Sequence, residues 1–365
     1  MKGNRTEKRL FLPRYALILY GIAVFSLAVY LVAVLSPSFA GWFQGTVAVA
    51  VRFCLGHLTG VLPFSLAEIL IFTLPLLIAL LGFLAWQRCT TWRNMGVFLA
   101  SVLSVVSLLF TLFVFSFGAG YHTAPLDERL SLPTNDVSAE ELRATAVLLA
   151  ERVNQAAQGV EFGEDGFSKM PYDLQGMNER LLEAYGGISQ KYSFIPRLGV
   201  GVKPVLASKA MSYTHITGVY TYFTGEANVN VYFPDYTLPY TAAHEMAHQR
   251  GIARENEANF VAFLVCAESG DAYLQYTAYL NLFEYVANAL WSVDREAYKE
   301  VLRSLSPHVI GELRAYDAFF EAFRDSALAD VSNAVNDTYL KVHGNKEGTA
   351  SYGLVVDLAV AYFKE

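Results

Sequence analysis

Long apolar runs dominate the first third of the chain. Residues 15–35 and 95–117 carry no charged side chain, and residues 64–86 carry only Glu68, near their start. A helix needs about 20 apolar residues to cross the hydrocarbon core of a bilayer. The pattern therefore predicts three transmembrane helices. Pro75 should kink the second one, which a membrane helix tolerates when its neighbours satisfy the freed carbonyl.

The stretch between the first two predicted spans is apolar but mixed. Four glycines interrupt it, and Arg52 and His57 lie inside it. An interfacial or re-entrant helix over residues 38–62 fits this mixture better than a fourth span. The first apolar run is longer than the core of a signal peptide and is followed by further spans, so a retained helix is favoured over a cleaved leader.

Basic residues are distributed unevenly around these spans. Five lie in the N-terminal tail and two in the loop after the second span, against one in the first loop and one just after the third span. Cytoplasmic loops carry an excess of Lys and Arg. A multi-pass protein of the cell membrane is predicted, with a cytoplasmic N-terminus and an extracytoplasmic C-terminal part.

The pattern changes after residue 118, where charged and turn-forming residues return. A capping box at Ser138–Glu141 begins an amphipathic helix. Residues 200–232 are rich in β-forming residues and predict two or three strands, with turns near Lys203-Pro204 and Thr224-Gly225. The pattern is helical from Leu238 to about residue 324. The predicted fold is α+β: a three-helix transmembrane region (1–118), then a mainly helical domain with a small β-sheet (119–365).

Composition narrows the function classes. Apolar residues make up 54% of the chain and charged residues 17%, which excludes a disordered protein. The net charge of −7 gives no support for binding nucleic acid. Three widely spaced cysteines cannot form a disulfide framework or a cysteine-rich zinc site.

One motif carries recognisable chemistry. His244, Glu245 and His248 form H-E-x-x-H. Side chains four apart on a helix share a face, so the two imidazoles can bind one Zn²⁺, and Glu245 can hold a metal-bound water and accept its proton. The alternative is a paired-histidine polar face, and the motif arises by chance in roughly one such chain in a hundred. The motif nevertheless favours catalytic zinc, because a structural site needs a fourth ligand and no cysteine lies close.

The third ligand should come from the next helix. Gly251 is predicted to end the motif helix, and a second helix begins near Arg254 and offers Glu255 and Glu257. We favour Glu255 because Asn259 shares its face and could hydrogen-bond a ring nitrogen of His244 or His248. Glu257 remains the alternative ligand.

These residues also carry a resemblance to known families. HEMAHQRG at 244–251, followed by ENEANF at 255–260, resembles gluzincin-type metallopeptidases, in which a glutamate on the next helix completes the zinc site. The same residues, with the segments Ser212–Asn228 and Lys346–Leu358, resemble the DUF3810 family of bacterial membrane proteins over most of the chain. The resemblance implies a membrane-anchored, zincin-like domain with no defined substrate. The gap between His248 and Glu255 is shorter than in many gluzincins.

Residues that contact a substrate are less clearly marked. Asn228 and Asn230 alternate with valines on a predicted strand before the motif, where an extended peptide could bind. A solvated strand face is the equal alternative.

A peptidase also needs a donor for the oxyanion of the reaction. The sequence offers four candidates, for each of which a packing or surface role is the more ordinary one: Tyr352, Arg254, His215 and His343.

The predicted function is a membrane-anchored, zinc-dependent metallopeptidase acting on peptides or proteins outside the cytoplasm. Two alternatives stay open: a non-catalytic zinc-binding sensor or assembly factor of the membrane, and a zinc amidase acting on cell-wall peptides. A zinc site inside the bilayer is disfavoured because residues 238–265 carry too many charged side chains for a lipid-facing span.

Overall fold

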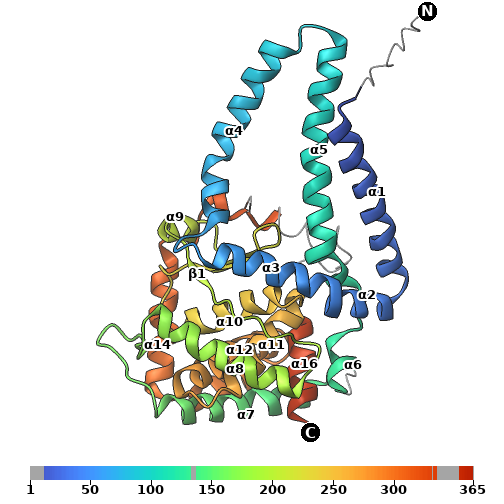
Figure 1. Cartoon of the computed structure of the whole chain (residues 1–365). Coiled ribbons are helices and arrows are strands. Elements are labelled where there is room, and N and C mark those ends of the chain that lie inside the picture. Colours follow the sequence, from blue (N-terminus) through green and yellow to red (C-terminus); the bar gives the residue numbers. More distant parts are fainter. Residues whose placement is uncertain (1–11, 133–136, 331, 335–352, 365) are drawn as a thin grey trace, which may run out of the picture.

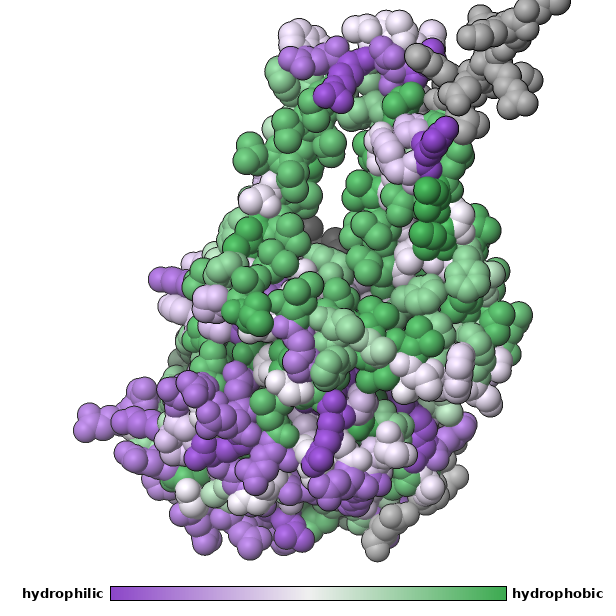
Figure 2. Space-filling model, in the orientation of Figure 1, coloured by the Kyte–Doolittle hydropathy of each residue, from purple (hydrophilic) through white to green (hydrophobic). Residues whose placement is uncertain are grey.

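Figure 1 shows the computed structural model, which is mostly helical. The structure describes residues 12–132, 137–330, 332–334 and 353–364. Apolar side chains gather over the N-terminal helices, and hydrophilic ones cover the opposite end of the molecule (Figure 2). The chain therefore separates into a part suited to lipid and a part suited to water.

Three long apolar helices match the predicted spans closely. They are α1 (Arg14–Leu35), α4 (Leu66–Arg88) and α5 (Trp92–Ser116). Side-chain caps fix where two of them begin, because the hydroxyls of Ser65 and Thr91 accept hydrogen bonds from backbone amides of the first turn. α1 packs along α5, whereas α4 diverges from both (Figure 1).

The structure corrects the expected number of membrane-span candidates from three to four. α2 (Pro37–Phe43), a π-helical turn at Gln44–Ala48 and α3 (Val49–Gly60) form a segment that is also long and apolar enough to cross a membrane. Arg52 counted against this in the sequence, but its side chain is buried within the protein and hydrogen-bonded there. The segment runs across α1 and α5 and joins the end of α1 to the start of α4 (Figure 1).

The remaining helices form a layered helical domain. α12 (Ala272–Val293) packs on α7 (Ala139–Ala157), and both share one large apolar core with the helices of the motif. The predicted capping box at Ser138 and Glu141 is present at the start of α7. The other helical elements are η2 (Gly118–His122), α6 (Leu126–Leu130), α8 (Leu174–Lys191), α9 (Ser208–Ser212), α13 (Arg295–Ser304), α14 (Pro307–Glu321) and α16 (Leu354–Phe363).

The sheet has three short strands in the order β1-β3-β2. β1 (Lys203–Pro204) is parallel to β3 (Glu226–Val229), and β2 (Gly218–Thr221) is antiparallel to it. The predicted turn at Gly225 is present with φ +71°, while Lys203-Pro204 forms a strand instead of a turn because an edge strand accommodates proline. β2 is the other edge of the sheet.

The start of α4 is tied to the sheet by two carboxylates. Glu226 of β3 accepts hydrogen bonds from the backbone amides of Leu66 (3.0 Å) and Ala67 (2.8 Å). Glu68 of α4 accepts from two amides at 206–207, at 2.9 and 2.8 Å. Carboxylates near the first amides of a helix are favoured by its dipole. The apolar helices and the helical domain are thus joined by buried contacts as well as by the chain.

Candidate metal centre

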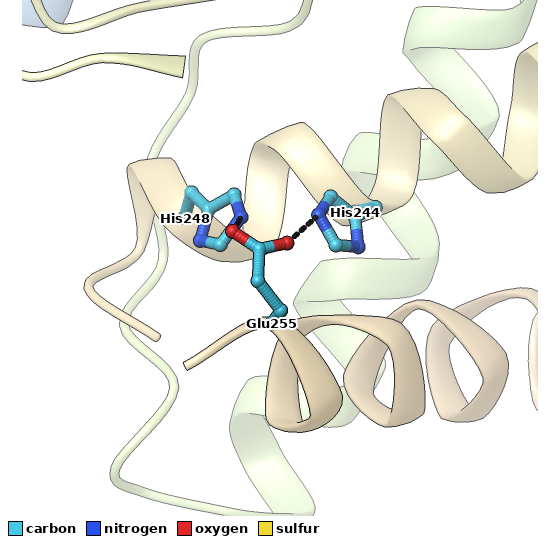
Figure 3. A group of neighbouring side chains, drawn as sticks. All are labelled: His244, His248 and Glu255. Atoms are coloured by element: carbon cyan, nitrogen blue, oxygen red, sulfur yellow. Dashed lines mark ion pairs between the residues drawn. The ribbon is translucent and has the colours of Figure 1, made fainter. Parts of the chain in front are cut away.

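Two consecutive helices bring the predicted ligands together. α10 (Thr237–Gln249) carries His244 and His248, and α11 (Glu255–Ala267) begins at Glu255. Gly251, at φ +94°, ends α10 and lets the chain reverse. Figure 3 shows the Glu255 carboxylate between the two imidazoles, 3.2 Å from Nε2 of His244 and 3.5 Å from Nε2 of His248. The three ligand atoms lie within 4.8 Å of one another.

The ring of His248 is held by a backbone carbonyl. Its Nδ1 lies 2.7 Å from the oxygen of Ile252, which can only accept, so Nδ1 donates a proton there and Nε2 is the nitrogen that faces Glu255. The sequence pattern could not predict this contact, because it is made by the backbone of Ile252 and not by its side chain. The expected bond from Asn259 to an imidazole is not among those of the described residues, and its amide nitrogen and Nδ1 of His244 are buried without a partner there. The role of Asn259 stays a prediction.

The charges of the cluster are strongly coupled. Burial favours the neutral form of Glu255, but His248 and His244 outweigh it and hold the pKa of this carboxyl well below its usual range. Burial likewise lowers the pKa of His248, and the facing carboxylate reverses this and raises it to about 9. Two imidazole nitrogens and a carboxylate oxygen are donors that Zn²⁺ prefers, and catalytic sites use three protein ligands. The cluster therefore fits a divalent ion in place of its protons.

Glu257, the alternative ligand, turns away from the histidines. Its carboxylate accepts hydrogen bonds from the amide of Leu126 (3.0 Å), from Arg129 (2.6 Å) and from Arg254 (2.6 Å). It is buried, and all of these partners lie away from the imidazoles. Glu257 thus connects α6 to the start of α11. Glu255 is the carboxylate that lies beside His244 and His248.

Glu245 lies between the motif helix and the edge strand β2. It is buried, which raises the pKa of its carboxyl, and the nearby imidazoles and the backbone amide of Tyr220 only partly offset this. A methyl group on Gly218 would lie 2.7 Å from Oε1 of Glu245, so the strand backbone presses directly against the carboxylate. Oε2 has no hydrogen-bond partner among the described residues. A buried carboxyl with one free oxygen suits a proton acceptor.

The asparagines predicted to contact substrate lie inside the protein. The side-chain amide of Asn228, on the central strand β3, donates to the carbonyl of Val219, and that of Asn230 donates to Ser212 and to the carbonyl of Ile216. Both are buried. Their role as substrate contacts stays a prediction. The edge strand beside the motif helix is β2, which the alternation of side chains alone did not distinguish from the central strand β3.

The four candidate oxyanion donors fall in different places. Arg254 is engaged with Glu257 and with the carbonyls of Tyr121 and Thr123. His215 lies 2.7 Å from the carbonyl of Phe323. The two remaining candidates, Tyr352 and His343, lie outside the described residues. None of these placements assigns the donor.

The membrane-side helices complete the surroundings of the centre. Arg52 of α3 donates to the carbonyl of Ser116 at the end of α5 (2.7 Å) and to that of Arg250 at the end of α10 (3.3 Å). The ring of Phe117 meets that of His248 edge-on at 5.9 Å between centroids. Sequence reasoning missed both contacts, and a charged residue inside an apolar helix was the signal for the first.

If the candidate centre holds Zn²⁺, replacing Arg52 with glutamine should weaken that binding by about 10-fold, the low end of the range for residues that position metal ligands. The shorter amide cannot hold the ends of α5 and α10 together, so His248 and Glu255 lose their fixed spacing. Chelator competition in detergent measures the affinity. Arg88→Gln, at the far end of α4, is the matched control. Unchanged affinity in both variants would contradict this role.

Comparison with known proteins assigns the chain to a protein family. Apolar helices suited to a bilayer and a partly buried two-histidine, one-glutamate cluster define a membrane-associated protein with a candidate metal centre. The family model of the DUF3810 proteins, described as proteins of unknown function, matches residues 43–360. The chain belongs to this family. No curated protein and no solved structure matches it.

Proposed function

We propose that the protein is a membrane-anchored, zinc-dependent metallopeptidase that hydrolyses peptide bonds on the extracytoplasmic side. The observation that carries this proposal is the convergence of His244, His248 and Glu255, with the buried carboxyl of Glu245 next to them. Glu245 and the third ligand come from two adjoining helices, as the gluzincin resemblance implies. A cluster of this kind built only for stability would not need a second carboxyl group, that of Glu245, whose Oε2 has no hydrogen-bond partner among the described residues.

The metal would be held by His244, His248 and Glu255. Bound Zn²⁺ supplies a Lewis acid that polarises a carbonyl and lowers the pKa of water. Of the protein's own groups, the carbonyl of Ile252 would hold the ring of His248 in place for the metal.

Glu245 would move the proton. Burial raises the pKa of the Glu245 carboxyl, which makes its carboxylate a stronger base. A general base works best when its pKa lies near the working pH. Its unpartnered oxygen Oε2 would accept the proton of the attacking water, and the same oxygen would deliver it to the nitrogen of the leaving amine. The amide of Tyr220 holds the carboxylate in place during both transfers.

The outer edge of β2 would bind the substrate backbone. Gly218 and Tyr220 face Glu245 from this strand, and an extended peptide can add to a free sheet edge through main-chain hydrogen bonds. Such binding places a peptide bond of the substrate beside Glu245 without requiring a particular side chain.

Replacing Gly218 with alanine should lower the rate of hydrolysis by about 10- to 100-fold, or about 1.4–2.7 kcal/mol of barrier. The added methyl would lie 2.7 Å from Glu245 and 2.8 Å from Thr241, so the carboxylate must shift. Zinc content should not change, because no ligand moves. Gly187→Ala, on the open surface of α8, is the control. Loss of zinc together with activity would argue against this reading of Gly218.

The membrane arrangement follows from the same proposal. We take α1, α4 and α5 as the crossing helices and the segment 37–60 as lying along the outer membrane surface. The end of α1 and the start of α4 lie on the same side as the helical domain, and this segment connects them (Figure 1). The basic residues at the α4–α5 connection lie at the other end, which suits the cytoplasm.

Hydrolysis by the full-length protein in nanodiscs tests the proposal. A randomised peptide library, read by mass spectrometry, should be cut. A chelator should stop the cleavage, and added Zn²⁺ should restore it. Cleavage that resists the chelator, or no cleavage by the zinc-loaded protein, would contradict the proposal.

A further inference from the structure

The candidate metal centre lies at the end of a membrane helix. Phe117, whose ring contacts His248, directly follows the last residue of α5. A side chain on Gly120, a few residues later, would lie 2.8 Å from the carbonyl of Gly251 in the turn between the two ligand helices. Arg52 donates hydrogen bonds to the carbonyl of Ser116, at the end of α5, and to that of Arg250, at the end of α10. The ligands are therefore fixed relative to the end of α5 by three separate contacts.

Exposed tryptophans mark one face of the bilayer. At the far end of the α4–α5 pair, Trp86 and Trp92 are 78% and 85% exposed, and tryptophan is enriched at membrane–water interfaces. At the other end, α5 stops at Ser116, where Phe113, Phe117 and Tyr121 are buried in one cluster with Ala253 of the domain.

The length of α5 places the other face of the bilayer. Trp92 and Phe113 are 21 positions apart on α5, about 32 Å at about 1.5 Å per residue. The hydrocarbon core is about 30 Å thick. The interface on the domain side therefore passes close to Phe113 and Phe117, at the level of the ring that touches His248.

We propose that the substrates are polypeptides anchored in the bilayer by a transmembrane helix, cut in the short segment that leaves the lipid. This inference rests on the proposed hydrolase. A site at this depth reaches bonds within about 10 Å of the lipid, or about three extended residues at about 3.3 Å each. A folded soluble protein cannot bring an internal bond so close to the membrane, whereas a juxtamembrane segment is there already. Anchoring also supplies an effective concentration in the mM range.

The test uses the full-length protein in proteoliposomes with two substrate libraries. One carries a synthetic transmembrane helix followed by a randomised 20-residue external segment, about six times the reach of the site; the other is the same segment without the helix. The anchored library should be cut at least about tenfold faster, and its cuts should fall within about the first three external residues. The Glu245→Gln variant is the negative control, which measures any cleavage that does not depend on this site. Equal rates, or cuts spread along the segment, overturn the inference alone. Cleavage of neither library overturns the proposed hydrolase and this inference with it.

A second measurement places the site without any catalysis. A nitroxide on Val219→Cys, beside Gly218 on β2, is compared with one on Val147→Cys on α7, at the opposite end of the domain (Figure 1). Cys54 and Cys89 are replaced by serine, and Cys266 is buried. A nickel-chelating lipid should relax the label at position 219 strongly and the label at position 147 little. Equal relaxation would show that the site stands away from the bilayer, and the inference would fall.

Discussion

Replacing Glu245 with glutamine should slow peptide hydrolysis severely while leaving the zinc content of the protein unchanged. The amide keeps the size of the side chain and its contact with Gly218 but cannot accept a proton. General bases contribute about 10²- to 10⁴-fold in rate, and we expect a loss in that range. Single-turnover cleavage of the anchored library measures it, with metal analysis on the same sample.

The same variant separates the remaining functional classes. A non-catalytic sensor or assembly factor would keep its function with glutamine at position 245, since the imidazoles and Glu255 still bind metal. A zinc amidase on cell-wall peptides would lose activity just as a peptidase does, so isolated wall peptides must be tried beside the protein library. Hydrolysis that survives Glu245→Gln would remove this residue from the mechanism.

Replacing Glu255 with glutamine should release the zinc. A neutral amide is a poor ligand and leaves two imidazoles, so affinity should fall by more than the about 10- to 100-fold that an outer partner costs. Hydrolysis should fall in proportion to the metal lost and recover partly at high Zn²⁺. Chelator competition by the full-length protein gives the affinity.

Glu257→Gln is the matched control for that experiment. It removes the same charge two residues away, and its carboxylate faces Arg129, Arg254 and Leu126 instead of the imidazoles. Stability should fall by about 1–3 kcal/mol, because the partly exposed Arg129 and Arg254 lose a charged partner, but zinc should stay. The opposite pattern, with metal lost at position 257 and kept at position 255, would reverse the ligand assignment.

Local patterns were enough to predict the elements and the core of the cluster. Long apolar runs marked α1, α4 and α5 to within a few residues, because lipid demands continuous apolar surface. The i,i+4 spacing of His244 and His248 placed both rings on one face, and the glycine at 251 announced the reversal that brings Glu255 to them. These inferences need only helix geometry and a short connection.

Long-range packing accounts for what the sequence could not reveal. Arg52 counted as a reason against a membrane-span candidate, yet its charge is satisfied by carbonyls of residues far along the chain, including Ser116 and Arg250. The carbonyl of Ile252 that orients His248 has no side-chain signature. Asn228 was predicted from alternation, which cannot tell a central strand from an edge strand.

X-ray absorption of the zinc-loaded, full-length protein tests the central claim most directly. The account predicts one zinc per chain with two imidazole nitrogens and carboxylate oxygen at about 2.0–2.2 Å. It also predicts that His244→Ala and Glu255→Gln each lose this signal while Glu257→Gln keeps it. A protein that takes up no more zinc than His244→Ala, or a spectrum with sulfur in place of the imidazoles, would contradict it.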